Sequence, residues 1–326
     1  MNLSNIDRKL VELLQAECPL TKHPYADVGL GLGISEEEVI AQIKQLKADG
    51  IIRQIGAVWA AGKLGYKTTL VAMRVAENHM DKAAQLLIKH PRISHAYERN
   101  HYYNLWFTLA TLATNDIEAE LPELAEPIKA EAFFSLPAVT TFKLRTHFAL
   151  GGDGQAEAPA NHKVGVREQK AKLSSSDGMV INELQQDLPL VPHPFADMSA
   201  RLGMAEDKFL SWCQSLKQRG IMRRFGAAVN HRKVGFKANA MTCWVVPPEK
   251  IDVAGRKLAL LKEVSHCYER KTNPLWRYNL FAMIHGRTKE ACQEIASKVS
   301  AETGLTDYVM LFSTREIKKT RIKYLV

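Results

Sequence analysis

QLKADGIIRQIGAVWAAGKLGYK, residues 45–67, recurs as SLKQRGIMRRFGAAVNHRKVGFK at residues 215–237, with three glycines at matching positions. Each copy runs from an amphipathic pattern, through a glycine, into a short apolar stretch. A glycine directly after a helical pattern is a helix stop signal, and a short apolar stretch beyond it is consistent with a strand. The two copies therefore predict the same local fold twice in one chain, a helix followed by a β-wing.

The repeat extends over both halves of the chain, at an offset near 170. HPYADVGLGLGI (23–34) matches HPFADMSARLGM (193–204), and SHAYER (94–99) matches SHCYER (265–270). Between the copies, residues 151–178 are rich in Gly, Ala, Ser and charge, which is typical of a flexible linker. Two long repeats are too few for a solenoid. The chain is therefore a fused duplication, and each copy is expected to be a complete folding unit.

The sequence pattern of each copy predicts two folding modules, which follow one another in the same order in both copies. The first contains a helix, a short helix, a turn and a helix that starts at Ser35 with Glu38 three residues on, a capping-box pattern. With the wing strand, this is a winged helix-turn-helix. The following pattern, strand-helix-strand-strand-helix-strand, predicts a ferredoxin-like βαββαβ sandwich, so the fold class is α+β. The predicted domains are a helix-turn-helix module at 1–62, a ferredoxin-like domain at 63–150, the linker at 151–178, a second helix-turn-helix module at 179–233 and a second ferredoxin-like domain at 234–326.

The composition is that of a globular protein with an anionic partner. The chain has 326 residues, of which 46% are hydrophobic and 24% charged, as in ordinary soluble domains. It shows no apolar run of roughly 20 residues and no signal-peptide core at its start, so we expect a cytoplasmic protein without a membrane contact. The five cysteines are scattered, which favours reduced thiols and no thiolate metal site. The net charge of +9 favours an anionic ligand.

A helix-turn-helix joined to this sandwich resembles the Lrp/AsnC regulators, which implies duplex DNA as a partner. The charges oppose that function. Residues 1–56 carry six Lys or Arg against eight acids, and the recognition-like helix opens with Glu36, Glu37 and Glu38. Such a helix normally brings cationic or amide side chains into a strongly negative groove. We therefore expect no specific nucleic acid partner and interpret these modules as scaffold.

Polar side chains recur along one predicted strand of each copy. Because side chains alternate along a strand, His95, Tyr97, Arg99 and His101 share one face, and His266, Tyr268 and Arg270 share the equivalent face. A ferredoxin-like sheet has helices over one face only, so these side chains are expected on the other. The alternative is a solvated edge strand with incidental polar residues.

Comparing the copies separates two groups of histidines. His23 matches His193 and His95 matches His266, which favours structural roles for these four. His101 and His231 have no histidine counterpart, so they are the candidate catalytic residues of an asymmetric site between the halves. His147 and His285 are also unmatched or ambiguously matched, but they lie near predicted strand ends.

Cations and aromatic residues gather beside these positions. Arg and Lys bind carboxylates, and aromatic rings stack on planar groups, so a planar molecule fringed by carboxylates would fit. Single-stranded nucleic acid would use the same features. The candidate substrate-binding residues are Tyr97, Arg99, Arg232, Tyr268, Arg270, Trp276, Arg277 and Lys319.

Three stretches carry a more specific resemblance. RNHYYNLWF (99–107) resembles the AhbA (NirD-like) half of the siroheme decarboxylases, whereas GAAVNHRKVGFKANAM (226–241) and LWRYNLFAMIHG (275–286) resemble the AhbB (NirL-like) half. The order of the halves is that of the fused NirDL proteins. The resemblance implies removal of carbon dioxide from the C12 and C18 acetate side chains of siroheme. The product, 12,18-didecarboxysiroheme, serves heme d1 or alternative heme biosynthesis. The family's histidine positions carry over to His101 and His231.

The resemblance also implies the protein's partners. The iron belongs to the siroheme substrate, so no further cofactor and no separate metal site are expected. A homodimer or higher oligomer through the ferredoxin-like sheets is expected, as are contacts with other proteins of heme d1 biosynthesis. Two rival functions remain at this point, an Lrp/AsnC-type transcriptional regulator and a heme sensor that binds iron porphyrin without changing it.

Overall fold

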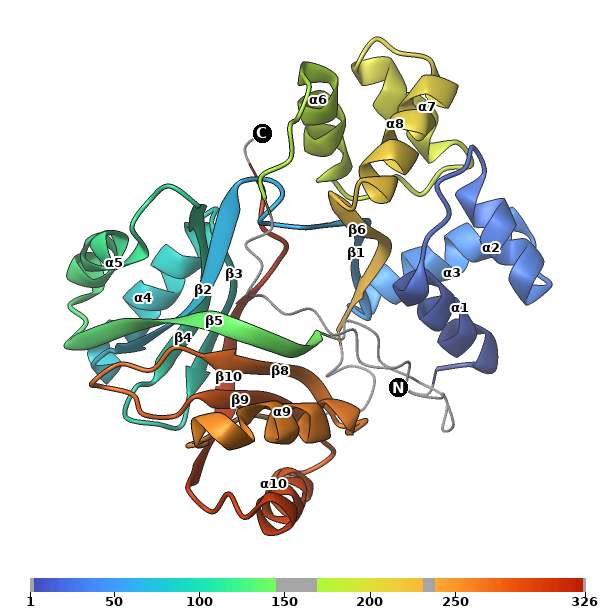
Figure 1. The fold of residues 1–326 in the computed structure, drawn as a ribbon. Helices are drawn as coiled ribbons and strands as arrows, with labels where there is room; N and C mark the ends of the chain where they lie inside the picture. The colour runs from blue at the N-terminus through green and yellow to red at the C-terminus, as the bar shows by residue number, and fades with distance from the viewer. Residues whose placement is uncertain (1–2, 145–168, 231–237, 325–326) are drawn as a thin grey trace.

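The computed structural model describes residues 3–144, 169–230 and 238–324. It contains the two predicted helix-turn-helix modules (Figure 1). Ser35 accepts a hydrogen bond from the Glu38 N–H while the Glu38 carboxylate accepts one from the Ser35 N–H, so the predicted capping box is confirmed. The first module consists of α1 (Asn5–Ala16), α2 (Pro24–Leu32), α3 (Glu36–Ala48) and β1 (Ile52–Trp59), and the second of α6 (Ser175–Leu184), α7 (Pro194–Arg201), α8 (Glu206–Gln218) and β6 (Met222–Val229).

The predicted wings form one shared sheet. β1 pairs with β6 in antiparallel register, with Gly56 opposite Gly226, rather than folding into a separate hairpin in each module. β6 also lies close against α1 of the first module, and this approach needs the glycine at 226, because a Cβ there would lie 2.5 Å from the carbonyl oxygen of Leu14. The two modules also bury a common apolar core. They therefore form one paired unit, seen on the right of Figure 1.

The predicted linker is too long at its C-terminal end. Ser174 caps α6 and forms a capping box with Asp177, so residues from 174 onward belong to the second module. The serines and the glycine at 178 were wrongly interpreted as part of a linker, because Ser and Asp favour helix N-termini as much as loops. Residues 145–168 of the predicted linker lie outside the described residues.

The two ferredoxin-like units form one closed barrel. Its strand order is β10-β3-β4-β2-β5-β8-β9-β7, and β7 pairs with β10 to close it. The elements of the first unit are β2 (Tyr66–Arg74), α4 (Glu77–Lys89), β3 (Ile93–Arg99), β4 (Leu105–Leu112), α5 (Ile117–Ala125), the 3-10 helix η1 (Glu126–Ile128) and β5 (Ala132–Leu144). Those of the second are β7 (Ala238–Trp244), the 3-10 helix η2 (Pro248–Lys250), α9 (Ile251–Leu260), β8 (Val264–Arg270), β9 (Leu280–Gly286), α10 (Lys289–Thr303) and β10 (Tyr308–Lys319).

The last strand of each unit joins the two sheets. β5 leaves β2 at Pro137 and continues along β8 of the other unit, and β10 leaves β7 at Phe312 and continues along β3. The predicted domains 63–150 and 234–326 are therefore not independent, since each completes the sheet of the other. Phe142 of β5 even packs on α9 at Gly255, where a Cβ would lie 2.4 Å from its ring.

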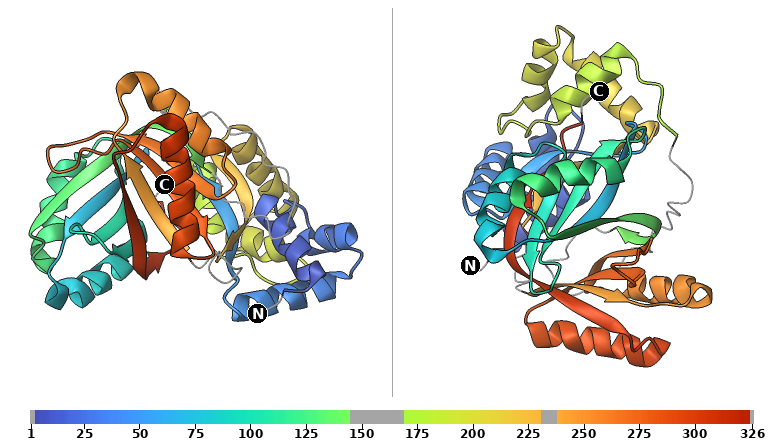
Figure 2. Two further views of the ribbon diagram at one scale, coloured as in Figure 1. Left: turned by 90° about the horizontal axis from the view of Figure 1, so that it is seen from below. Right: turned by 90° about the vertical axis from the view of Figure 1, so that its left-hand side faces the viewer.

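Apolar side chains fill three layers of this body. The helices α4 and α5 cover the outer face of one sheet and α9 and α10 that of the other (Figure 2). The inner faces of both sheets share a further cluster that includes Trp106, Leu136, Leu311 and Phe281. The open faces predicted from sequence thus face each other inside the barrel. Within the described ranges, no helix is long and apolar enough to cross a membrane.

Candidate active site

Two matching rows of polar side chains line the barrel interior. The first row, on β3, consists of His95, Tyr97 and Arg99, and the second row, on β8, consists of His266, Tyr268 and Arg270. The alternation predicted from sequence is confirmed, since Ala96 and Cys267 between them face the outer helices. The edge-strand alternative is wrong, because each of these strands is paired on both sides.

The arginines at the ends of the rows tie the halves together. Arg99 donates to the carbonyl oxygen of Leu311 at 2.9 Å, and Arg270 donates to that of Leu136 at 2.7 Å. Each guanidinium also lies over the tyrosine of its own row, 5.3 Å and 4.7 Å from the ring centroids. Both arginines thus hold the strand that arrives from the other half. These two bonds set the register between the final strands of the halves, because they make Leu136 and Leu311 equivalent.

This register exposes a difference between the strands that cover the rows. Glu316 lies opposite Tyr97 and Lys319 opposite His95 in the first row. The equivalent positions in the second row hold Thr141 opposite Tyr268 and Leu144 opposite His266. The first row therefore has an acid and a cation from β10, whereas the second row has two uncharged side chains from β5.

The acid beside the first row is already neutralised. Arg53 of β1 donates to the Glu316 carboxylate at 2.7 Å and also reaches the Lys319 carbonyl oxygen at 3.3 Å. Its counterpart on β6 is Arg223. Burial raises the pKa of the nearby Tyr268 phenol, and the charges of Arg270 and Arg223 partly offset that rise. Thr141 stands at the place equivalent to Glu316.

The two rows also differ in accessibility. Tyr97 and Arg99 are only 8% and 4% exposed, whereas Tyr268 and Arg270 are both partly exposed. The tyrosine and arginine of the first row are therefore less accessible than those of the second, whereas the histidines of both rows are partly exposed. The prediction that Tyr97 and Arg99 bind substrate is not tested by these contacts, but their burial favours a structural role.

Three histidines and a lysine gather at the end of the barrel nearest the helix-turn-helix pair. Desolvation, followed by the charge of Lys319, lowers the pKa of His95 to about 3 and that of His266 to about 4. Desolvation, followed by the neighbouring His266 and Lys319, lowers the pKa of His285 to about 3. All the charged neighbours that shift these three pKa values are themselves cationic or imidazole groups. Such a cluster stabilises an incoming carboxylate, which would in turn favour the charged imidazoles.

The histidines of the cluster are connected differently in the two halves. His95 Nδ1 contacts the Ser94 hydroxyl at 2.8 Å. His266 Nδ1 contacts the Ser265 hydroxyl at 2.7 Å, and the same hydroxyl contacts His285 Nε2 at 2.7 Å. Both His95 and His266 keep part of their surface accessible. Among the described residues, only the second half has a continuous chain of hydrogen-bonding groups leading away from its row histidine, because the repeat places Ala110 opposite His285.

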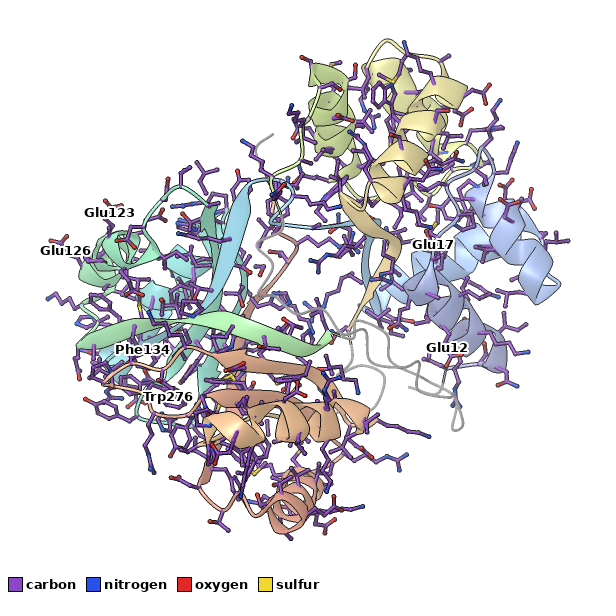
Figure 3. The ribbon with its side chains drawn as sticks, in the orientation of Figure 1. Glu12, Glu17, Glu123, Glu126, Phe134 and Trp276 are labelled. Atoms are coloured by element: carbon purple, nitrogen blue, oxygen red, sulfur yellow. The ribbon has the colours of Figure 1, made fainter. Side chains whose placement is uncertain are left out.

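His101 lies at the opposite end of the barrel. It follows β3, whose His95 and Arg99 are about 13 Å apart at ~3.3 Å per residue. Its Nδ1 accepts a hydrogen bond from the Tyr103 N–H at 3.1 Å, and its ring lies 5.4 Å from that of Trp276. Burial lowers its pKa, and the hydrogen bond from Tyr103 partly offsets this effect. Trp276 in turn stacks on Phe134 of β5, so His101 borders an aromatic cluster between the halves (Figure 3).

The remaining predicted site residues are spread over three places. Trp276 is buried in that aromatic cluster, and Arg277 is exposed and pairs with Asp307 at 2.6 Å. His231 and Arg232 lie outside the described residues. Ala238, the first described residue after them, pairs with Gly286 beside His285. The described part of the chain therefore does not bring His101 to the end where Lys319 and His266 meet.

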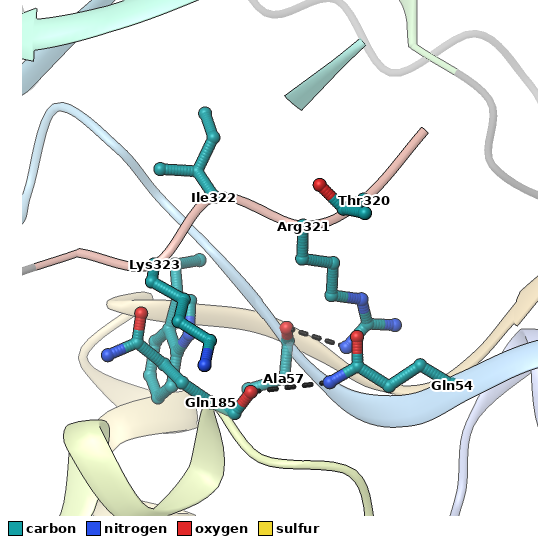
Figure 4. Close-up of a pocket in the computed structure, with 8 residues that line it drawn as sticks. Gln54, Ala57, Gln185, Thr320, Arg321, Ile322 and Lys323 are labelled. Carbon is teal, nitrogen blue, oxygen red and sulfur yellow. Dashed lines mark hydrogen bonds between the residues drawn. The ribbon is translucent and has the colours of Figure 1, made fainter. Parts of the chain in front are cut away.

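A small cavity lies between the segment after Lys319 and the helix-turn-helix pair (Figure 4). Its volume is about 220 Å³ and the segment after Lys319 lines it, which is small for a tetrapyrrole. Arg321 crosses it and donates to the carbonyl oxygens of Ala57 in β1 and Gly226 in β6, at 2.8 and 2.9 Å. This segment fastens β10, and with it Lys319, to the helix-turn-helix pair.

Sequence reasoning missed the residues that make the rows unequal. Glu316 and Thr141 could not be compared, because the final strands match at an offset of 175 rather than near 170. Ser265 and His285 were visible as residues, but their contact depends on the pairing of β8 with β9. The one available signal was the absence of a histidine at Ala110.

The fold and site define a class of protein, a duplicated AsnC-like chain whose barrel interior has diverged between its halves. Residues 63–143 and 233–318 match the AsnC-like ligand binding domain, and residues 7–53 and 177–223 match the siroheme decarboxylase NirDL-like HTH domain. A siroheme decarboxylase of Hydrogenobacter thermophilus is 36% identical over 317 residues, covering 97% of this chain and 94% of the relative. The chain belongs to the siroheme decarboxylase family.

Other relatives agree with this assignment. The siroheme decarboxylase NirDL subunit of Paracoccus denitrificans is 33% identical over 97% of this chain and 96% of its own length. The beta subunit of the Methanosarcina barkeri enzyme is 39% identical over 46% of this chain and 99% of that subunit. The crystal structure of the siroheme decarboxylase NirDL superposes with a TM-score of 0.74 at 34% identity, over 99% of this chain and 95% of that one. A second structure of it, with the same score, contains an iron-uroporphyrin III analogue.

Proposed function

We propose that this chain is a siroheme decarboxylase that removes carbon dioxide from the C12 and C18 acetate side chains to give 12,18-didecarboxysiroheme. The single observation that carries the proposal is the second row, a partly exposed His266, Tyr268 and Arg270 inside a barrel in which the equivalent Tyr97 and Arg99 are buried. Family membership supports it. The product would enter heme d1 or alternative heme biosynthesis.

The reaction needs two things from the protein. Loss of carbon dioxide breaks the bond between the carboxyl carbon and the methylene carbon, and leaves the electron pair on the methylene carbon and its pyrrole. A proton must then reach that carbon to form the methyl group, so each carboxylate lost consumes one proton and no electrons are exchanged. The protein has to hold the substrate's carboxylates and supply a proton donor, for which histidine is suited.

The predicted residues take the following parts in this proposal. Lys319 and Arg270 bind substrate carboxylates, Tyr268 contacts the macrocycle, and Arg232, Trp276 and Arg277 remain predicted binding residues. His101 and His231 remain the proposed catalytic pair on the evidence of their asymmetry between repeats. No cofactor beyond the iron of the substrate is included.

We further propose that the two halves act as the separate subunits do in related enzymes, because one Methanosarcina subunit matches half of this chain. The halves already complete each other's sheets. A homodimer of the chain, and contacts with other proteins of heme d1 biosynthesis, stay within the proposal. Light scattering of the purified chain would determine its oligomeric state.

The test is anaerobic incubation of the purified chain with siroheme, followed by mass spectrometry of the pigment. The proposal predicts the loss of two carbon dioxide molecules per siroheme without added reductant. A heme sensor would bind the pigment and return it unchanged. Unchanged siroheme from folded protein that shows pigment binding would therefore refute decarboxylation.

A further inference from the structure

We propose that His266 is a further catalytic residue, which delivers a proton to the substrate, and that Ser265 and His285 form the relay that resupplies it. The inference rests on the proposed function and deepens it by assigning a route for the proton. The reaction removes two carboxylates and so needs two protonations. His266 was expected to be structural, because the first half carries a histidine at the same place. The structure shows that the two places are not equivalent.

The first step of the argument is access. Arg53 and Glu316 form an ion pair beside the first row, where Tyr97 is buried. In the second row the uncharged Thr141 replaces that acid and Tyr268 is partly exposed, while the two row histidines, His95 and His266, are both partly exposed. A carboxylate that enters the barrel would find Arg53 already engaged by Glu316 at the first row, whereas Thr141 places no competing carboxylate at the second. The substrate is therefore expected to present its acetate to His266 rather than to His95.

The second step is connectivity. A serine hydroxyl has one proton to donate and can accept another. When Ser265 donates to His266 Nδ1, His285 Nε2 donates to Ser265, and the His266 ring carries its proton on Nε2. The two contacts of 2.7 Å are short enough for both bonds. In the first half Ser94 contacts His95, but Ala110 replaces the second imidazole and no relay can form there.

The relay takes up as many protons as it gives away, and none of its groups is left charged. His266 gives its Nε2 proton to the methylene carbon and receives the Ser265 proton on Nδ1. Ser265 receives the Nε2 proton of His285, which takes up one proton on its own Nδ1 once water reaches that buried atom. One proton enters at His285 and one leaves at His266. All three groups end neutral, with the hydrogen bonds reversed.

The relay matters because the resting imidazole of His266 is neutral. Desolvation and the cations Lys319, Arg270 and Lys143 hold its pKa near about 4, while His285 on β9 and His95 on β3 add further imidazoles to the same cluster. Without a relay, a neutral histidine that gave up its only proton would become an imidazolate. A variant lacking the relay would have to react through the scarce imidazolium, whose population falls about tenfold per pH unit above its pKa.

The repeat supplies a matched pair of variants for the test, Ser265→Ala and Ser94→Ala. Each removes one hydroxyl beside a row histidine. Turnover of siroheme is measured anaerobically between about pH 6 and pH 8, the range around neutrality that histidine donors serve. We expect Ser265→Ala to lower kcat by about a hundredfold, a typical contribution of a general acid, with KM nearly unchanged. Its kcat should also fall more steeply with rising pH than that of the unaltered chain.

Two further variants test the relay at the hydroxyl of Ser265 and at the imidazole of His285. Ser265→Thr retains the hydroxyl and is expected to restore most of the turnover, whereas His285→Gln is expected to behave like Ser265→Ala. Ser94→Ala should leave kcat and its pH profile unchanged. If Ser265→Ala and Ser94→Ala have equal turnover, or if the pH profile of Ser265→Ala parallels that of the unaltered chain, the relay is refuted while the proposed function stands. Unchanged siroheme from the unaltered chain would refute the proposed function and the inference with it.

Discussion

The first and second rows occupy equivalent places in one barrel, and yet the tyrosine and arginine are partly exposed only in the second. His95 and His266 follow a buried serine in the same way, and Arg99 and Arg270 hold the opposite strand through the same bond. The difference comes from the strand that covers each row, which belongs to the other half. A duplicated chain can therefore keep its fold through one set of residues and change its chemistry through another.

The covering strands show how this division is possible. A substitution on β5 alters the surroundings of β8, and one on β10 alters those of β3, because the final strands exchange sheets. Neither change disturbs the hydrogen bonds that hold the barrel, since these involve the backbone and the two arginines. In two identical subunits any change would appear at both rows. Fusion of the halves removes that constraint.

The largest effect is expected from His101→Ala, which tests whether the aromatic end of the barrel takes part in catalysis. Removal of a proton donor typically lowers turnover by about a hundredfold to ten-thousandfold. Because His101 is only half buried and lies in a loop, the fold should survive, as circular dichroism would verify. Tyr102→Ala, at an exposed neighbour, serves as the control. Full turnover by His101→Ala would contradict a catalytic role for His101.

Thr141→Glu tests the difference between the rows, because it places an acid in the second row where Glu316 stands in the first. The new carboxylate would lie opposite Tyr268 and repel those of the substrate. We expect siroheme affinity, measured by anaerobic absorbance titration, to fall at least about tenfold, because like charges brought together cost several kcal/mol. Thr141→Val, which has nearly the same shape, should bind as the unaltered chain does. Unchanged affinity for both variants would show that the substrate does not approach the second row.

A smaller effect is expected from His23→Ala and His193→Ala. The two rings contact each other across the helix-turn-helix pair, with centroids 4.0 Å apart. Loss of such a contact costs about 0.5–1.5 kcal/mol, so thermal unfolding should shift downward by a few degrees. Turnover per folded molecule should be preserved, because the pair lies outside the barrel. A loss of turnover at unchanged stability would contradict the structural role of these matched histidines.

We expect the protein not to bind duplex DNA with sequence specificity. Both recognition-like helices, α3 and α8, begin with acids, and the modules are paired through β1 and β6. At about 150 mM salt, where charges beyond ~8 Å are largely screened, a mobility-shift assay should show no sequence-specific complex. A specific shift that survives this salt concentration would restore the regulator as a function.

Much of the fold followed from local patterns. The capping box at Ser35, the glycine at 50 and the alternation along β3 were correct, because each depends on residues close in sequence. The exchange of β5 and β10 was not predictable in its register, since it depends on contacts between distant halves. The start of α6 was missed because a serine-rich segment is compatible with either a linker or a helix cap.

The candidate site was only partly predictable for the same reason. The rows of His, Tyr and Arg could be read from strand periodicity. The roles of Glu316 and Thr141 depend on strand pairing, and the contact between Ser265 and His285 depends on a β-bulge at the start of β8. Comparison of residue types in the two repeats assigned His95 and His266 the same structural role, whereas the residues around them in the structure favour different roles.

The central claim, that substrate lies against the second row while the first row holds the barrel, is tested most directly by siroheme affinity in Arg99→Gln and Arg270→Gln. Each variant loses one charged hydrogen bond to a backbone carbonyl oxygen, so both should lose similar thermal stability. Only Arg270→Gln should bind siroheme more weakly, by about tenfold to a hundredfold if one carboxylate loses a charged hydrogen bond worth about 1.5–3 kcal/mol. Equal loss of affinity in the two variants, or a loss confined to Arg99→Gln, would contradict the account.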